Sequence, residues 1–198
     1  LYLPKNLMVQ TGFTLSQSQT LFEGMGSLSA QHYSNYPPLN QLCFYISGLV
    51  SPNSIFGAVT VFRVLIILAD VGVFYFGRKI LIHLQRNPNQ MFLYLLNPLV
   101  IIELTGNLHF EGVMIFFLIW SLYLLSISKW MASAVVIGFS ISVKLLPLLL
   151  LPLFYKRLGF QKTILYGAIA IGVNIVLFFP FLSSELIQNY TDTIGLWF

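Results

Sequence analysis

The sequence predicts an all-α protein whose helices cross a membrane several times as a bundle. Three observations predict this class. Only 8% of the 198 residues are charged, whereas a soluble domain carries about 25%. Hydrophobic residues make up 57% of the chain, so there are too few ions to cover a water-facing surface. Aromatic residues make up 16%, which is typical of a surface that meets acyl tails and headgroups.

The membrane helices are expected in the apolar runs, because a helix needs roughly 20 apolar residues to cross the hydrocarbon core. One apolar run, 39–50, is too short to cross and stops at Ser51-Pro52-Asn53. Residues 1–37 are polar and are expected to form an exoplasmic loop segment, with 38–198 the transmembrane helical domain of a longer protein. The runs expected in the membrane are 54–76, 90–104 with a break at Asn97-Pro98, 112–127, 130–154 and 163–182.

The basic residues predict the orientation. They fall in the loop 77–89, at Lys129 and in the loop 155–162, and basic loops face the cytoplasm. The loops 1–53, 105–111 and 183–195 are then exoplasmic. This assignment requires that 39–50 does not cross and that 130–154 consists of two short re-entrant helices that turn near Lys144 and Pro147.

Broken backbone inside a membrane is tolerated only where it is buried in protein or lines a wet cavity. The two irregular elements open toward the same face, so we expect a cavity on the exoplasmic side.

Polar residues gather on that side, in the loop from Thr105 to Gly112. His109 and Glu111 are candidate catalytic residues, and Asn107 and Glu103 are candidate substrate-binding residues. Such side chains are costly at membrane depth and are usually functional. The alternative is that they are ordinary loop residues solvated by headgroups and water.

Three further charges lie within apolar runs. Arg63 and Asp70 are seven residues apart, hence on one helical face and about 10 Å apart along the axis. They either contact substrate or hold helices together. Lys144 lies at a predicted helix break, where it either binds a phosphate or extends to the membrane interface.

Several classes of site are excluded. There is no phosphate-binding glycine loop, no nucleophile elbow and no His-Glu-x-x-His helix. The single cysteine, Cys43, excludes an internal disulfide and a multi-thiolate metal site. The three histidines lie on different elements. We therefore expect no metal, no cofactor and no nucleic-acid partner.

From about residue 30 to its end, the chain resembles the GT-C superfamily of integral membrane glycosyltransferases. Within it, the sequence is most similar to bacterial mannosyltransferase-like proteins, which are distantly similar to the first mannosyltransferase of GPI-anchor synthesis. The resemblance rests on the order of its motifs. These are Asn35-Tyr36-Pro37-Pro38-Leu39, Arg63 with Leu68-Ala69-Asp70, Asn97-Pro98 with Glu103, Gly106-Asn107-Leu108-His109-Phe110-Glu111-Gly112, and Lys144-Leu145-Leu146-Pro147.

The resemblance implies a GT-C-type bundle that moves a hexose, mannose by this likeness, from a polyprenyl-phosphate donor to an acceptor on the exoplasmic face. Its partners would be that donor and the membrane lipids. The family's catalytic acid precedes the Tyr-Pro-Pro element, here Tyr36-Pro37-Pro38, and Tyr36 joins the candidate substrate-binding residues. The only acid before Tyr36 is Glu23. Either Glu23 is the base, or that base precedes Leu1 in the full protein.

Two other classes remain open, a transporter or lipid-linked oligosaccharide flippase and a structural subunit. A transporter would also show broken helices and isolated charges, but no pair of corresponding interrupted segments is visible. We expect a bacterial inner membrane. The endoplasmic reticulum is the alternative, because Asn189-Tyr190-Thr191 matches the N-glycosylation triplet.

Overall fold

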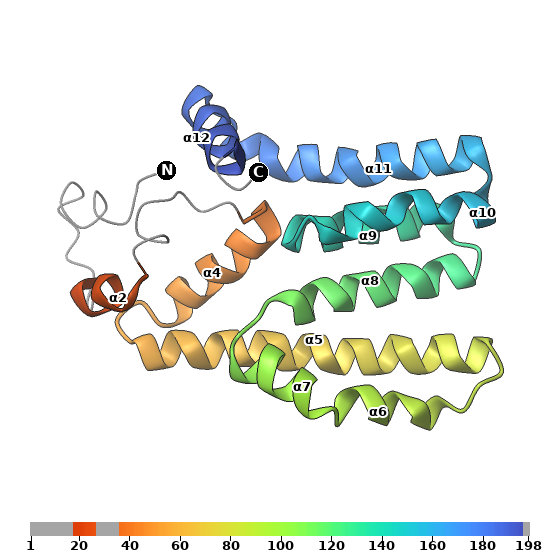
Figure 1. Ribbon diagram of the computed structural model, residues 1–198, viewed down its shortest axis with the longest axis horizontal. Coiled ribbons are helices and arrows are strands. Elements are labelled where there is room, and N and C mark those ends of the chain that lie inside the picture. The colour runs from red at the N-terminus through yellow and green to blue at the C-terminus, as the bar shows by residue number, and fades with distance from the viewer. Residues whose placement is uncertain (1–17, 27–35, 196–198) are drawn as a thin grey trace.

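The computed structural model describes residues 18–26 and 36–195, and every regular element within these ranges is helical (Figure 1). The predicted all-α class is confirmed. A short helix, α2 (Ser18–Gly24), stands in the segment expected to be an exoplasmic loop. Most of that segment lies outside the described residues.

The bundle begins with α4 (Pro38–Val50) and the long helix α5 (Ile55–His83). The Ser54 hydroxyl caps α5 by accepting a hydrogen bond from the Gly57 backbone N–H. α4 has 13 residues, about 20 Å of helix, which is short of the roughly 30 Å hydrocarbon core. The expectation that 39–50 does not cross fits this length.

The chain between α5 and the next helix is a shorter connection than the predicted loop 77–89. That prediction was wrong in its extent, because residues 77–83 continue α5. Arg78 lies 5.4 Å from the ring centroid of Phe74, and Lys79 lies 4.3 Å from that of Tyr75. These cation–π contacts let the helix extend into the basic region without leaving its charges unpartnered.

Three short elements then run back along α5, after the 3₁₀ turn η1 (Pro88–Gln90). They are α6 (Met91–Leu95), α7 (Pro98–Val100) and the π-helix η2 (Ile101–Gly106). The predicted break at Asn97-Pro98 is confirmed, and the Asn97 side chain accepts a hydrogen bond from the Leu99 backbone N–H.

The remaining elements complete the bundle. They are α8 (Glu111–Ser126), α9 (Trp130–Val143), η3 (Leu146–Phe154), α10 (Tyr155–Leu158), α11 (Phe160–Phe178), η4 (Phe179–Phe181) and α12 (Ser184–Gly195). α8 packs between α5 and α9, and α9 packs against α11 (Figure 1). The run 130–154 is broken as predicted, because α9 ends at Val143 and the 3₁₀ helix η3 begins at Leu146.

Three hydroxyl groups inside the bundle are paired with one another. The hydroxyls of Ser121, Ser133 and Tyr166 form one buried network between α8, α9 and α11, with oxygen–oxygen distances of 2.8–3.0 Å. Cys43 is buried in the apolar cluster shared by α4, α5, α8 and α9, as expected for a small apolar residue. That cluster lies under the site described below.

Within the described ranges, two helices are long and apolar enough to cross a membrane, Ile55–His83 and Phe160–Phe181. A third candidate is the pair Pro98–Gly106 and Glu111–Ser126, which bends by 116° at its break. The chain is therefore a membrane protein, with two or three candidate spans among the described residues where the predicted orientation uses four crossings, namely 54–76, 90–104, 112–127 and 163–182.

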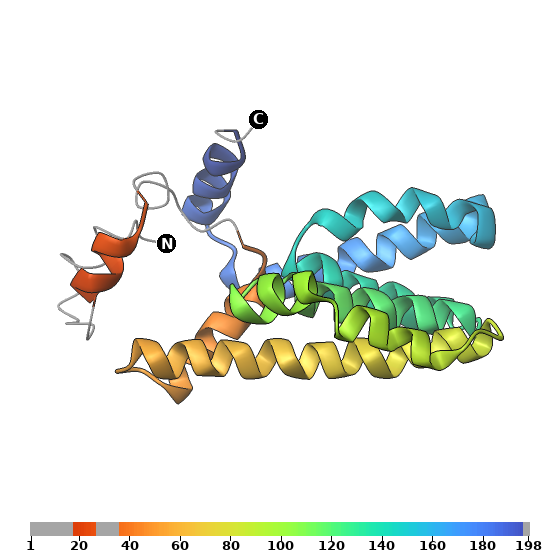
Figure 2. The same cartoon turned by 60° about the horizontal axis from the view of Figure 1, so that its bottom comes forward.

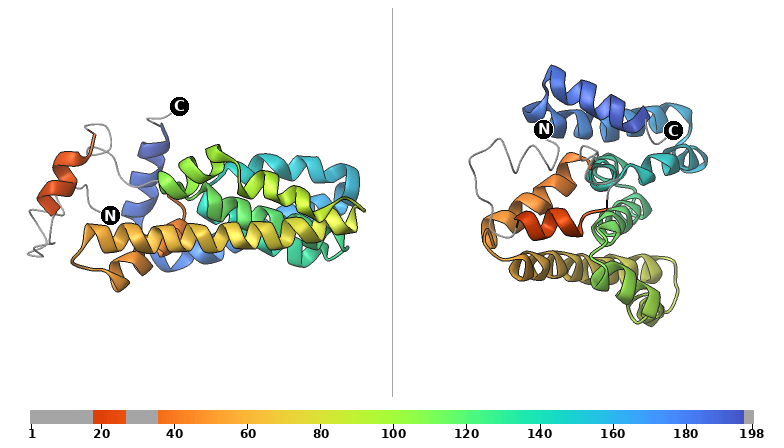
Figure 3. Two further views of the ribbon diagram at one scale, coloured as in Figure 1. Left: turned by 90° about the horizontal axis from the view of Figure 1, so that it is seen from below. Right: turned by 60° about the vertical axis from the view of Figure 1, so that its left-hand side comes forward.

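The two ends of the bundle differ in chemistry. The connections after α5 and α8 and the short helix α10 lie together at the end drawn on the right of Figure 1, and they carry the basic residues Arg86, Lys129, Lys156 and Arg157. The 107–110 loop, the break after Val143 and α4 lie at the opposite end. Figure 2 shows α2 and α12 projecting at this second end, and the left view of Figure 3 shows both helices at the same end from below.

Candidate active site

The first wall of the site is the loop between η2 and α8. The π-helix closes with hydrogen bonds from the Asn107 N–H to the Ile102 carbonyl (2.8 Å) and from the His109 N–H to the Leu104 carbonyl (3.0 Å). Leu108 has φ = 59°, the left-handed region that bulky residues rarely adopt. The chain thereby turns sharply, and α8 starts at Glu111 with its carboxylate at the rim of the site.

The second wall is the break after α9. Lys144 has an extended backbone (φ −152°, ψ 140°) that ends the helix. Its Nζ forms an ion pair with Oε1 of Glu111, and the two side chains are 47% and 31% exposed. Each charge also suits its own helix, because Glu111 stands at the N-terminus of α8 and Lys144 at the C-terminus of α9.

The third wall is the first turn of α4, which is fastened to the end of α9. The Leu39 N–H donates to the Ser142 hydroxyl at 3.2 Å. Asn40 Nδ2 donates to the Val143 carbonyl at 3.3 Å. Asn40 was not among the residues predicted from the sequence, because the partner that buries it, Val143, is 103 residues away.

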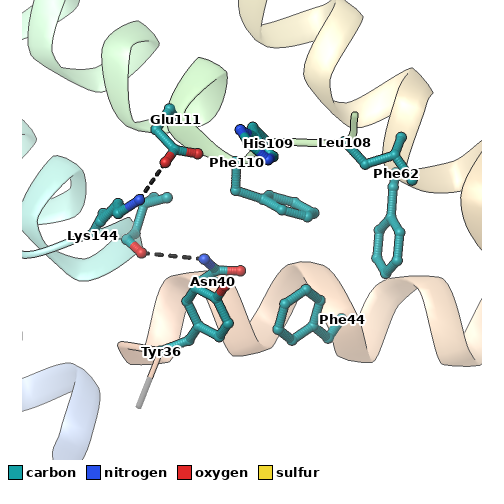
Figure 4. A pocket seen from close by; sticks show the side chains of 10 residues that line it. Tyr36, Asn40, Phe44, Phe62, Leu108, His109, Phe110, Glu111 and Lys144 are labelled. Carbon is teal, nitrogen blue, oxygen red and sulfur yellow. Dashed lines mark hydrogen bonds and ion pairs between the residues drawn. The ribbon is translucent and has the colours of Figure 1, made fainter. Parts of the chain in front are cut away.

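The three walls enclose a cavity of about 320 Å³. Figure 4 shows polar side chains on one part of its lining, namely Asn40, His109, Glu111 and Lys144. Aromatic rings form another part, namely Tyr36, Phe44, Phe62 and Phe110. Phe44, Phe62 and Phe110 meet edge-on, with centroids 5.4–5.7 Å apart. An apolar wall facing fixed polar groups is typical of a small-molecule site.

Two candidate residues, Glu103 and Asn107, stand beside His109 and do not line the cavity. His109 Nδ1 lies 3.7 Å from Oε2 of Glu103, and Asn107 Nδ2 donates to the same oxygen at 3.2 Å. Glu103 is thus the carboxylate next to the imidazole, and Asn107 contacts Glu103. Tyr36, His109, Glu111 and Lys144 are the predicted site residues that the structure brings together around the cavity.

The other predicted site residues lie elsewhere. Asp70 is 8% exposed and accepts a hydrogen bond from the Tyr94 hydroxyl at 3.4 Å, which joins α5 to α6. This contact favours the helix-joining reading of Asp70. Arg63 lies on the exposed face of α5, and Glu23 lies in α2; neither lines the cavity. Among the described residues, no group of three or more His, Cys, Asp or Glu side chains could hold a metal ion.

Comparison with known families identifies one match. A family model described as alpha-(1->6)-mannopyranosyltransferase, N-terminal domain, matches residues 11–158, more than half of the chain. The matched range contains every residue of the cavity lining. No curated protein and no solved structure matches the chain.

Proposed function

The chain belongs to the MptA_B family, described as alpha-(1->6)-mannopyranosyltransferase, N-terminal domain, and we propose that it transfers mannose in this cavity. The donor is a polyprenyl-phosphate sugar, and the acceptor is a hydroxyl on the exoplasmic face. The protein is a membrane glycosyltransferase of a mannosyltransferase family.

The observation that carries this proposal is the Lys144–Glu111 ion pair at the cavity rim. A lysine ammonium has three N–H donors. Glu111 takes one of them, and the other two are available to a second anion. A lipid-linked sugar phosphate brings such an anion, and its leaving group gains negative charge as the sugar departs. A fixed cation at that point stabilises the transition state more than the ground state.

The reaction requires one bond to form and one to break. The acceptor oxygen bonds to the anomeric carbon, while the bond from that carbon to the phosphate oxygen breaks and its electron pair leaves with the polyprenyl phosphate. The acceptor's proton passes to a base. Glu111 and His109 are the candidate bases at the cavity, and Glu23 or an acid upstream of Leu1 is the candidate that the family resemblance supplies.

The position of the cavity supports a lipid-linked donor. It lies at the end of the bundle opposite the basic connections, so the positive-inside rule favours the exoplasmic side. A cavity at headgroup level would receive the sugar and the phosphate while the polyprenyl chain stays in the hydrocarbon. A nucleotide sugar, in contrast, is made and held in the cytoplasm.

The proposal is tested with the purified full-length protein in lipid vesicles, supplied with an α-mannoside acceptor. Radiolabelled mannose is offered as polyprenyl-phosphate mannose or as GDP-mannose, with polyprenyl-phosphate glucose to test the sugar. We expect transfer from polyprenyl-phosphate mannose and little from the other two. Transfer from GDP-mannose without any lipid-linked intermediate would overturn the donor assignment.

A further inference from the structure

Asn40 is the most deeply buried polar side chain of the cavity lining. It is 1% exposed, although it lies in the first turn of its helix. Its Nδ2 donates to the Val143 carbonyl, at the free C-terminal end of α9. This hydrogen bond fixes which end of the carboxamide faces α9, because a flipped amide would place its oxygen against a carbonyl oxygen.

The other end of the same amide has no partner. Asn40 Oδ1 is buried and makes no hydrogen bond among the described residues. Figure 4 shows the oxygen turned away from Val143, on the side of the amide that faces the aromatic rings. A buried acceptor without a donor is costly, and in natural proteins it calls for an explanation. An uncharged hydroxyl group of a bound ligand would supply the missing donor to Asn40 Oδ1.

We propose that the Asn40 carboxamide oxygen accepts a hydrogen bond from a hydroxyl of a hexopyranose bound in the cavity, and so selects the sugar; this rests on the proposed function. The sugar is either the one transferred or the acceptor's own. Phe44 lies on the oxygen's side of the amide (Figure 4), and its apolar ring suits the C–H face of a pyranose ring. Glu111 and Lys144 line the same cavity, where the reacting groups would lie.

Because the oxygen itself is closed to solvent, a sugar reaches it only when a lining side chain shifts. Tyr36 is the most exposed Tyr or Phe side chain of the lining, at 46%, whereas Phe110 is 9% exposed. The hydrogen bond to Val143 keeps Asn40 in place during such a shift.

The chain provides a matched control in Asn174 on α11. Its Nδ2 also donates to backbone carbonyls, those of Gly138 (3.0 Å) and Ala170 (2.9 Å), and its Oδ1 is likewise buried without a partner. Asn174 does not line the cavity. Substitution of Asn174 therefore reproduces the packing change of an Asn40 substitution without touching a sugar.

The test measures kcat/KM of the full-length enzyme with mono-deoxy analogues of mannose, one series in the lipid-linked donor and one in the acceptor. In the unmodified enzyme, we expect one hydroxyl whose removal costs about five- to tenfold, the value of a single uncharged hydrogen bond. In Asn40→Leu, removal of that hydroxyl should cost nothing further, while the costs at all other positions persist. Asn174→Leu should retain the full pattern. If the cost disappears in the donor series, Asn40 binds the transferred sugar. If it disappears in the acceptor series, Asn40 binds the acceptor's sugar.

Three results would overturn the inference. One is that no hydroxyl of either sugar costs more than about twofold, below the value of one hydrogen bond. Another is that the same costs persist in Asn40→Leu, which would make Asn40 a packing residue only. A third is that Asn174→Leu loses the same discrimination, which would make the effect one of packing. If Asn40→Leu fails to fold, Asn40→Ala is used, with the same expected result and the same contradicting one. Absence of any transfer from lipid-linked mannose would instead refute the proposed function.

Discussion

Lys144 and Glu111 form an ion pair although they are 33 residues apart in the sequence. The pair joins the break after α9 to the start of α8, and thereby connects one predicted irregular element, the run 130–154, to the polar loop that the sequence placed on the same face. Each residue was a candidate on separate grounds, one as a phosphate ligand and one as a catalytic group. Their pairing places both at the cavity, and we propose that they act together there.

Tyr94→Phe should lower the stability of the protein and leave its substrate affinity unchanged. The substitution removes one of the donors to Asp70, a buried carboxylate outside the cavity that the Thr105 side chain also hydrogen-bonds. Loss of one hydrogen bond to a buried carboxylate costs about 1–3 kcal/mol. Thermal unfolding in detergent and the KM for the donor measure the two effects. Tyr155→Phe, on an exposed tyrosine of α10, is the control that should change neither. A raised KM without loss of stability would instead place Asp70 among the substrate-binding residues.

His109→Ala and Glu103→Gln should not have additive effects on transfer. Glu103 does not line the cavity and lies next to His109, so we expect its substitution to matter only while the imidazole is present. We expect the double variant to be no slower than His109→Ala alone, since residues in one network couple. Initial rates with saturating donor measure this. Rate losses that multiply in the double variant would give Glu103 a role of its own.

The orientation can be measured with single cysteines at Gln85 and Leu108 in a Cys43→Ser background. Gln85 lies in the basic connection after α5, and Leu108 lies in the loop at the cavity. An impermeant thiol reagent added to intact cells should label position 108 and not position 85. The opposite pattern would place the cavity in the cytoplasm and remove the argument for a lipid-linked donor.

Much of the architecture could be predicted from local sequence. Pro98 and Pro147 cannot continue a helix, so the two breaks followed from the chain itself. The end of α5 could not be predicted from local sequence. Basic residues at 78 and 79 suggested a loop, but aromatic neighbours on the same helix accommodate both cations.

The candidate site was predicted in part. Polar residues in apolar runs are conspicuous, which is why His109, Glu111 and Lys144 could be named in advance. Asn40 could not be distinguished from an interface residue, because its burial depends on Val143, 103 residues away. The Asp70–Tyr94 contact was hidden for the same reason, since tertiary packing selects the partner.

Gly138→Ala should destabilise the packing of α9 on α11. A Cβ at this position would lie 2.8 Å from Val173 Cβ and 3.0 Å from the Ala170 carbonyl oxygen, and backbone cannot yield as a flexible side chain does. We expect a loss of about 1–3 kcal/mol, the usual cost of overpacking. Gly167→Ala, with nothing within 4 Å of the added carbon, should be neutral or slightly stabilising. Equal thermal stabilities of the two variants would argue against the observed helix contact.

The most direct test of the whole account is the rate of mannose transfer from polyprenyl-phosphate mannose in Lys144→Met and Glu111→Gln. Both remove a charge at the cavity rim, and each should lower the rate about a hundred- to a thousandfold while membrane insertion stays intact. Lys144→Arg keeps the cation and should retain part of the activity. Lys129→Met, at the other end of α9, should transfer at the normal rate. Rates within about threefold of the unmodified enzyme in both rim variants, far below the loss expected for a charge-stabilising group, would contradict the assignment of this cavity as the active site.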